Sequence, residues 1–531
     1  MAVVCWNGVV VVAAMYAVFL AVGLVAARRS QEGTASDLMI AGRAMPFWLA
    51  TCTMIATWVD GGYLLGTAQY AFDYDPENGI LGVSAALQGG VCFGISLILG
   101  GLFFAHIMRR LEFTTIVDPF DARFGKKWAA VLFLPAMLGE LFWSGALLVA
   151  IGSTFSVLLD IDLTTGILLS AAVVTLYTMV GGMWSVAFTD AFQLALIPVG
   201  MLMSLPFVLE RTGGFVTTFE KYVAGRPGVD RLFPPLQPSD GWTLPAIVNW
   251  WDMTIMLTLG GIPWNCYFQR VLACQSPRKA QAHSIVAGVF TMILTIPPLI
   301  LGMAAFVLWG NADGAAASAI RSDPSKTLPM LLKETAPFPV LAMGLAAIIG
   351  AVTSSFSSSI LSAGSMFGWN VYRRLVAPGV TVDRLKTVIR LAIVLLGVGA
   401  VALALKVQSV AQLWLFTADL VFVLLFPQLL ASLYDPAANR IGSVVAFVVS
   451  LFLRLGGGIA ELDMPPFLPY DSCLAWFGCN DFAAVSAFPV RTFAAAAGLL
   501  LLPVVSRLTS RWDPPRALTR GSSVDDFLCE P

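Results

Sequence analysis

The sequence predicts an all-α polytopic membrane protein whose core is built from two five-span repeats in opposite orientation. Three observations support this: the apolar composition, the number of segments long enough to span a bilayer, and two spans interrupted near their middle. Of the 531 residues, 58% are hydrophobic and 12% are charged, with a mean hydropathy of +0.82. A soluble domain of this size is not that apolar, so we expect the chain to lie in a lipid bilayer. The net charge of −1 points to no nucleic-acid partner.

About 13 segments are apolar enough to cross the hydrocarbon core, which takes about 20 residues for each helix. They lie at about 6–27, 47–70, 79–104, 128–158, 163–182, 188–209, 246–267, 284–309, 336–369, 387–405, 410–433, 441–455 and 488–506. The ninth segment is long enough to contain a tilt, a loop or a misplaced boundary. The first lacks a basic start and a cleavage site, so we interpret it as a helix and not as a removed signal peptide.

The second segment contains the first interruption. Residues 51–70 read TCTMIATWVDGGYLLGTAQY, in which Trp58 and Asp60 are followed by two glycines. Each glycine weakens a helix by about 1 kcal/mol relative to alanine. A carboxylate near the bilayer centre costs about 2.5–3.5 kcal/mol or more, so Asp60 must face protein or water. We therefore predict that this helix is broken near residues 58–62.

A second interruption lies in residues 255–270, IMLTLGGIPWNCYFQR, where Gly260, Gly261 and Pro263 precede Trp264. Paired broken spans in the two halves of a chain are typical of the substrate site of a secondary transporter. Two kinked packing helices are the alternative, because glycine and proline are common in membrane helices. We favour transport because each break carries a tryptophan and the first also carries an acid.

Each broken span is the first of a set of five spans. Because the number of spans in a set is odd, the second set has the opposite orientation in the membrane, which makes the two sets an inverted repeat. The expected segments are a first helix and loop (1–46), repeat one (47–209), an extracellular loop (210–245), repeat two (246–434), two additional helices (435–506) and a short tail (507–531). With the N-terminus outside, 21 of the 31 basic residues fall inside, which predicts a cytosolic C-terminus. Cys473 and Cys479 lie in a predicted external loop, where a disulfide and two free thiols are both compatible with the sequence.

Hydroxyl side chains gather in the ninth span, AVTSSFSSSILSAGSMFGWN, where Phe356 alone interrupts a run of six from Thr353 to Ser359. Together with carbonyls freed at a broken helix, they would suit a small cation such as Na⁺. Serines that bond back to their own helix are the alternative. Since no metalloenzyme spacing, nucleophile motif or phosphate loop occurs, we expect no enzyme.

Four acids other than Asp60 lie in or beside spans. Glu140 is three residues before Trp143, on the same face of the fourth span. Asp190 begins the sixth span and Asp419 enters the eleventh. We interpret Asp252, near the start of the seventh, as an interfacial acid solvated by water.

Three tryptophans indicate the class of substrate. Trp58, Trp143 and Trp264 come from three different spans and are predicted to lie away from the membrane interfaces. Tryptophan is the best cation–π partner, worth about 2 kcal/mol or more when desolvated. A box of such rings recognises quaternary ammonium groups, whereas most of the 15 tryptophans are expected in interfacial belts. The three therefore predict a small organic cation as substrate.

Six stretches of the chain carry motifs of a known transporter family. They are IATWVDGGY (55–63), SLILGGLFFA (96–105), LYTMVGGMWSVAFTD (176–190), LGGIPWNCYFQRVL (259–272), SSILSAGSMF (358–367) and LVFVLLFPQLL (420–430). In these stretches the chain resembles the sodium/solute symporter family, and most of all its choline branch, over about residues 8–508. The resemblance implies a LeuT-like core, Na⁺-driven uptake of choline at the plasma membrane, and chloride dependence.

The resemblance also implies roles for individual residues. Trp58, Trp143 and Trp264 would enclose the trimethylammonium group, and Phe93 stands where the choline branch has a tyrosine. A sodium site would be formed by Ala56, Val59, Ala351, Ser354 and Ser355. Asp190 and Ser357 correspond to a second sodium site that some family members have.

Two positions depart from the choline branch. Position 357 is serine where that branch has aspartate, and position 60 is aspartate where it has glycine. We hypothesise that Asp60 is ionised and faces the substrate cation or a sodium ion, which would replace the lost carboxylate. The alternative is a protonated or loop-facing acid. The change also leaves open another amine or a betaine-like solute as substrate, and a ligand sensor or channel on the same fold.

Overall fold

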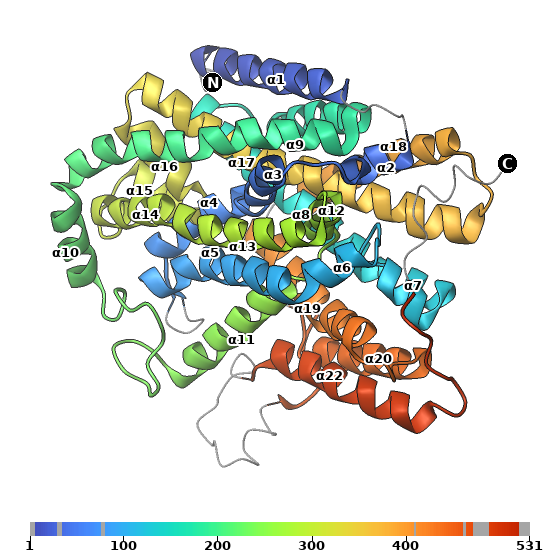
Figure 1. The fold of residues 1–531 in the computed structure, drawn as a ribbon. Helices are drawn as coiled ribbons and strands as arrows, with labels where there is room; N and C mark the ends of the chain where they lie inside the picture. The colour runs from blue at the N-terminus through green and yellow to red at the C-terminus, as the bar shows by residue number, and fades with distance from the viewer. Residues whose placement is uncertain are drawn as a thin grey trace.

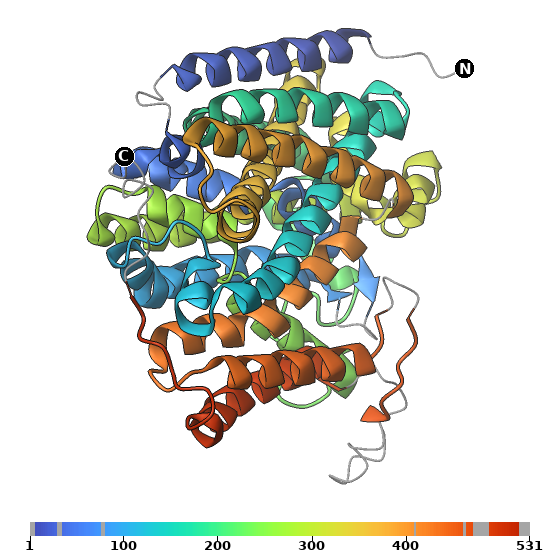
Figure 2. The same ribbon diagram turned by 90° about the vertical axis from the view of Figure 1, so that its right-hand side faces the viewer.

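The computed structural model describes residues 6–28, 34–75, 80–407, 410–459, 464–470 and 488–519. Cys473 and Cys479 lie outside these ranges. The long helices run side by side, with α1 (Trp6–Ala27) along one edge of the bundle (Figure 1). Helices α20 (Arg440–Gly456) and α22 (Val490–Thr509) lie along the opposite edge (Figure 2). The elements that carry the broken helices therefore lie between these outer helices.

The first five core spans follow α1. They are α3 (Phe47–Trp58) with α4 (Gly61–Phe72), α5 (Gly82–Leu99) with a π-helical segment (Gly100–Ala105) and α6 (His106–Arg110), α8 (Lys126–Leu159), and two spans within α9 (Leu163–Thr212). The chain reverses inside α9 at Gly182, whose φ of 54° and ψ of −146° favour glycine. Tyr177 and Gln193 both hydrogen-bond to Thr353, although a straight helix would hold them about 24 Å apart.

The second five core spans have the same order of elements. They are α11 (Leu244–Gly260) with α12 (Asn265–Ala273), α13 (Pro277–Leu294) with α14 (Ile296–Trp309), α17 (Phe338–Met366) with a π-helical segment (Phe367–Val376), α18 (Val382–Val407) and α19 (Val410–Tyr434). The long ninth segment of the sequence is thus helical without an internal loop: α17 alone has 29 residues, and the π-helical segment continues it to Val376.

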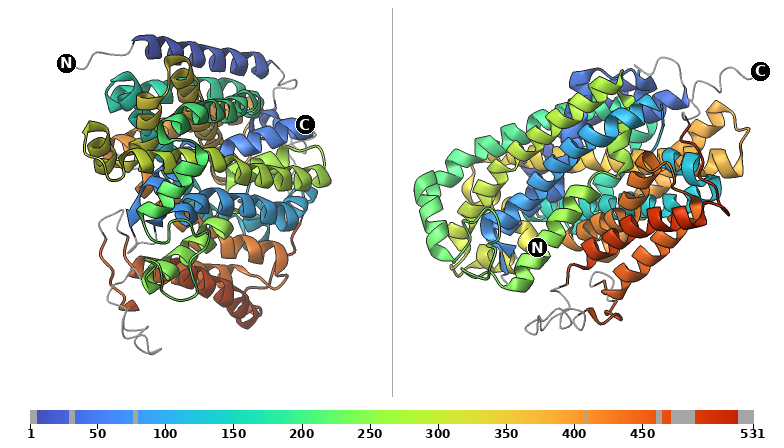
Figure 3. Two further views of the ribbon diagram at one scale, coloured as in Figure 1. Left: turned by 90° about the vertical axis from the view of Figure 1, so that its left-hand side faces the viewer. Right: turned by 60° about the horizontal axis from the view of Figure 1, so that its bottom comes forward.

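Short elements cover the two ends of the bundle. One end carries α10 (Phe215–Gly225), α15 (Ala315–Ser322), a 3₁₀ turn (Pro324–Lys326) and α16 (Thr327–Thr335). The other carries α2 (Ala35–Ile40), a 3₁₀ turn (Ala41–Arg43), α6 and α7 (Asp118–Phe124). Strands β1 (Tyr74–Asp75) and β2 (Ile80–Leu81) form an antiparallel pair after α4. Figure 3 shows the last two helices, orange and red, on the outside of the bundle.

Within the described ranges, nine helices are long and apolar enough to cross a membrane. The difference from about 13 predicted spans follows from how the chain is divided. α9 contains two spans, the two broken spans consist of shorter half-helices, and α20 has 17 residues.

Asp252 and Asp419 are buried in ion pairs. Asp252 of α11 is 3% exposed and lies 3.2 Å from Nη1 of Arg491, the second residue of α22. Asp419 of α19 lies 2.5 Å from Arg454 of α20. The interpretation of Asp252 as a solvated interfacial acid is therefore wrong. Its partner lies 239 residues away, which no local pattern reveals.

Candidate substrate and cation site

The first interruption makes Asp60 the N-cap of α4. Helix α3 ends at Trp58, Val59 leaves the helical region with a ψ of 70°, and α4 begins at Gly61. Oδ1 of Asp60 accepts the Tyr63 N–H at 2.5 Å. In an unbroken helix that N–H would bond to the carbonyl of Val59. The carboxylate thus satisfies a free N–H of α4 and leaves the Val59 carbonyl outside the helical ladder.

The second interruption lies between α11, which ends at Gly260, and α12, which begins at Asn265. Nε1 of Trp264 donates to the Gly260 carbonyl at 2.8 Å, which turns the indole back across the break. Glu140 of α8 accepts the Cys266 N–H at 3.3 Å, in the first turn of α12. Each half-helix that starts at a break therefore has a carboxylate at its N-terminus, where the peptide dipoles favour negative charge.

Four buried aromatic rings surround one cavity. The Trp58 ring centroid lies 5.1 Å from that of Phe93 and 6.2 Å from that of Trp143. Trp264 completes the box, 6.3 Å from Trp58 and 5.3 Å from Trp143. The lining of this cavity also includes Asp60, Gly261, Thr417 and Ala418. The structure thus brings together all five residues that the sequence predicted to bind substrate.

Asp60 supplies negative charge to this cavity. Its Oδ2 accepts the Nε1–H of Trp143 at 2.6 Å, and the residue is 2% exposed. None of the ion pairs in the described part of the chain includes Asp60. A charge removed from water needs a counter-charge or several hydrogen bonds. A carboxylate set among ring faces, with no basic partner there, is suited to a cationic ligand.

Four of the five residues predicted for the first sodium site, Ala56, Ala351, Ser354 and Ser355, meet where α17 crosses the end of α3. The fifth, Val59, follows α3 at the break. Oγ of Ser354 donates to the Ala56 carbonyl at 2.8 Å and to the Ala351 carbonyl at 3.0 Å. Oγ of Ser355 lies 2.9 Å from the Thr57 carbonyl and 3.2 Å from that of Ala351. Hydroxyls and carbonyls therefore converge at a helix C-terminus, where they offer the oxygen ligands that hard cations prefer. Since the same hydroxyls pack α17 on α3, the packing and ion-binding interpretations involve the same atoms.

Asp190 and Ser357, the residues predicted for a second sodium site, have different partners. Asp190 accepts the Thr53 hydroxyl at 2.5 Å and pairs with Arg270 at 3.2 Å, with both charged side chains fully buried. Ser357 donates to the Ser354 carbonyl at 3.0 Å. Because Arg270 already places a positive charge beside Asp190, a second sodium ion at this position stays a prediction.

Arg270 is a functional candidate that the sequence did not single out. In the sequence it follows the seventh predicted span as a basic residue on the cytosolic side, yet it is 0% exposed in α12. It donates to the Thr53 carbonyl at 3.2 Å and to the Ser358 hydroxyl, and so joins α12 to α3 and α17. A local pattern cannot distinguish a buried arginine at the end of a span from an interfacial one. Its partner Asp190 lies 80 residues away.

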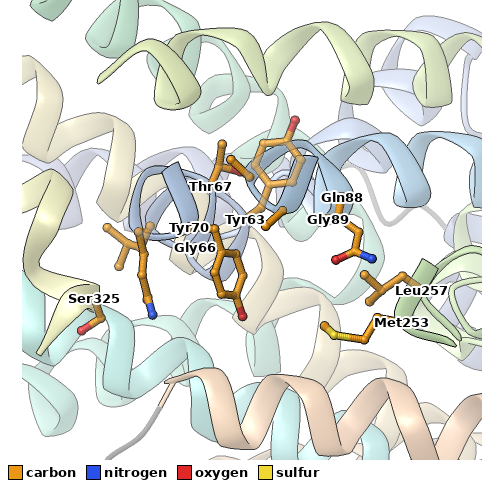
Figure 4. Close-up of a pocket in the computed structure, with 14 residues that line it drawn as sticks. Tyr63, Gly66, Thr67, Tyr70, Gln88, Gly89, Met253, Leu257 and Ser325 are labelled. Carbon is orange, nitrogen blue, oxygen red and sulfur yellow. The ribbon is translucent and has the colours of Figure 1, made fainter. Parts of the chain in front are cut away.

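A second cavity lies along α4, α5 and α11. It extends from Gly62, beside the first break, to Ser325 in the 3₁₀ turn at one end of the bundle. Figure 4 shows Tyr70 of α4 in this cavity, with Gln88 of α5 and Met253 of α11 nearby. The cavity thus lies between that end of the bundle and the aromatic box.

The model of the sodium:solute symporter family matches residues 38–449 of the chain. The chain is 35% identical to the high-affinity choline transporter 1 of Drosophila melanogaster, over 98% of this chain and 81% of that protein. It is 35% identical to the human protein of that name, over 94% of this chain and 85% of the human protein. The Torpedo marmorata protein is 37% identical, over 92% of this chain and 83% of its own length.

Solved structures share the fold at low sequence identity. A substrate-bound, outward-open Na⁺-coupled sialic acid symporter matches with a TM-score of 0.73 at 19% identity, over 94% of this chain and 98% of that one. A nucleobase-cation-symport transporter in a closed conformation matches with a TM-score of 0.54 at 12% identity, over 92% of this chain and 97% of its own. These matches confirm the predicted all-α, LeuT-like architecture.

Proposed function

The chain belongs to the sodium:solute symporter family, and we propose that it is a Na⁺-coupled symporter that imports choline across the plasma membrane by alternating access. The observation that supports this most is the cavity of Trp58, Trp143 and Trp264 closed by the carboxylate of Asp60. The relatives named as choline transporters match nearly the whole chain and point to the same substrate.

The cavity combines aromatic faces with a carboxylate, which suits a quaternary ammonium group. Three indole faces offer cation–π attraction of about 2 kcal/mol each or more when water is excluded. Each oxygen of Asp60 already accepts one hydrogen bond, from Tyr63 and from Trp143. Each keeps a further acceptor site, so a protonated amine would also find an acceptor there. To a quaternary ammonium group the carboxylate acts only as a charge. A trimethylammonium group, which has no N–H to donate, needs no more than this.

Na⁺ would bind where Ser354 and Ser355 of α17 meet the carbonyls at the end of α3. In that position the ion would hold α3 and α17 together and favour the state that is open to the outside. Choline would then close the aromatic box, and the two repeats would rock around it. Moving one charge inward through 100 mV supplies about 2.3 kcal/mol, or about fifty-fold in concentration, before the sodium gradient is counted.

We also propose an N-terminus outside and a C-terminus in the cytosol, which follows from the distribution of basic residues. The cavity between Gly62 and Ser325 would then be the entry route from outside. Chloride dependence is proposed from the resemblance to the choline branch. The function proposed is transport without an enzymatic reaction, in keeping with relatives that are named as transporters.

Three other functions are alternatives to test. A symporter of another amine would use the same box. A betaine-like zwitterion would bring its carboxylate into a cavity that already contains Asp60, and like charges repel there. A ligand sensor or channel would bind choline in the box without accumulating it.

Uptake of radiolabelled choline by cells that express the chain tests the proposal, with Na⁺ present or replaced by a large inert cation. Saturable accumulation that needs Na⁺ is the expected result. No choline uptake by protein shown to be at the cell surface would contradict the proposal, and uptake of other labelled amines or glycine betaine would then identify the substrate. Ligand-induced current without accumulation would favour the sensor or channel.

A further inference from the structure

Glu140 is a buried carboxylate that does not line the substrate cavity. It lies on the face of α8 that also carries Trp143, and it is 1% exposed. Its oxygens accept the Ser362 hydroxyl at 2.5 Å, the Ser359 hydroxyl at 2.8 Å and the Cys266 N–H at 3.3 Å. In the described part of the chain no ion pair includes Glu140. The acid thus joins three helices through hydrogen bonds.

One face of α17 connects this acid to the proposed sodium site. Ser355, Ser359 and Ser362 are spaced i, i+4 and i+7, so they share a side of the helix. Ser355 donates to the carbonyls at the end of α3. Ser359 and Ser362 donate to Glu140. The same side of α17 thus contacts the end of α3 at one end of this stripe and Glu140 at the other.

Glu140 in turn positions a wall of the substrate box. Its carboxylate accepts the N–H of Cys266. Cys266 lies two residues after Trp264, and Trp264 is the N-cap of α12. Asn265, between them, donates to the Ser362 hydroxyl at 3.0 Å. The break that carries Trp264 is thus fixed from two sides, by Glu140 of α8 and by Ser362 of α17. Moving either contact would move the indole.

We propose that Glu140 is a positioning residue that couples Na⁺ binding at the end of α3 to choline binding in the aromatic box. Na⁺ fixes the position of Ser355 and therefore of α17. Ser359 and Ser362 of α17 then fix the position of the Glu140 carboxylate, and the carboxylate fixes the position of Trp264. The inference rests on the proposed function. It deepens that function by naming the link between the two sites.

Glu140→Gln is the variant that tests the link, because it preserves the volume of the side chain. The amide keeps one accepting oxygen but presents N–H donors where the carboxylate accepts a second bond. Ser362→Ala removes one donor from the same acid and leaves Glu140 in place. Glu334→Gln, at an exposed position in α16, is the matched control.

The measurement is choline binding to the purified full-length chain in lipid nanodiscs, with and without saturating Na⁺. The ratio of the two dissociation constants is the coupling factor, and by linkage choline raises Na⁺ affinity by the same factor. We expect about tenfold or more for the unmodified chain and for Glu334→Gln. For Glu140→Gln we expect the factor to approach one while choline still binds weakly in both conditions. A lost fold would abolish both binding reactions.

Three outcomes would overturn the inference, and they differ in what else they affect. An unmodified chain that binds no choline, or binds it independently of Na⁺, would remove the proposed function as well. A Glu140→Gln variant with an unchanged coupling factor would remove the link and leave the function intact. If Glu140→Gln does not yield folded protein, Ser362→Ala decides: a factor reduced about threefold supports the link, and an unchanged factor overturns it.

Discussion

The indole nitrogen of Trp143 lies 2.6 Å from Oδ2 of Asp60, although 83 residues separate them in the chain. One wall of the substrate box is thereby bonded to the residue that caps α4 at the first break. Asp60 performs two tasks at once, since it starts a helix and supplies negative charge to a cavity of aromatic rings. Experiments on Asp60 must separate these tasks.

Asp60→Asn separates them, because asparagine is as good an N-cap as aspartate. The cap to Tyr63 is kept, while the charge and the hydrogen bond that Oδ2 accepts from Trp143 are lost. We expect the KM for choline uptake to rise at least tenfold, which corresponds to about 1.4 kcal/mol. The matched control is Asp162→Asn, at the exposed N-cap of α9, where Thr165 N–H is accepted in the same way. A near-normal KM in Asp60→Asn would show that the charge does not act on the substrate.

Substitutions in the aromatic box should follow the strength of the cation–π face. We expect Trp58→Leu to raise the KM for choline about thirtyfold, which corresponds to about 2 kcal/mol, and Trp58→Phe to raise it less. Trp143→Phe should raise the KM for choline more than Trp58→Phe does, because it also removes the hydrogen bond to Asp60. Trp48→Phe, at a position that is 54% exposed, serves as the control. Equal effects of Leu and Phe at position 58 would argue against recognition through the ring face.

The serines at the end of α3 should control Na⁺ more than choline. Ser354→Ala removes a hydroxyl that bridges Ala56 and Ala351. We expect a severalfold higher Na⁺ concentration for half-maximal uptake, with the KM for choline recovered at saturating Na⁺. Ser204→Ala is the control, because that buried hydroxyl bonds to the carbonyl of Gly200 in its own helix. The sodium-site assignment fails if both variants show the same Na⁺ dependence.

The buried pair of Asp190 and Arg270 should be needed for stability. Asp190→Asn leaves a guanidinium with 0% exposure without its counter-charge, which typically costs about 3–5 kcal/mol. We expect a lower thermal midpoint of the purified protein and less protein at the cell surface. The double variant Asp190→Asn with Arg270→Gln should recover part of the loss, since no unpaired charge remains. A single variant as stable as the unmodified chain would contradict this account.

The broken spans were predictable from the sequence because their signals are local. Paired glycines near Trp58 and Trp264 weaken a helix whatever the rest of the fold is. In the structure the helices end at Trp58 and Gly260. The three tryptophans and Asp60 were also predictable. Trp58, Asp60 and Trp264 lie at or near a break, and Trp143 shares a face of α8 with the polar residue Glu140.

The charge pairs were not predictable, because their partners come from distant segments. Arg270 resembles an interfacial arginine in the sequence and Asp252 resembles an interfacial acid. Their partners are 80 and 239 residues away, at Asp190 and Arg491. Burial of a charge depends on such a partner, so it becomes visible only when the helices are packed.

The most direct test of the account is choline uptake into proteoliposomes that contain the purified chain and an imposed inward Na⁺ gradient. We predict that labelled choline accumulates above its external concentration, and that a sodium ionophore which dissipates the gradient abolishes the accumulation. Asp60→Asn proteoliposomes should show a greatly reduced rate at low choline. Choline that merely equilibrates across the membrane, with the same rate in the presence and absence of the Na⁺ gradient, would contradict a Na⁺-coupled symporter.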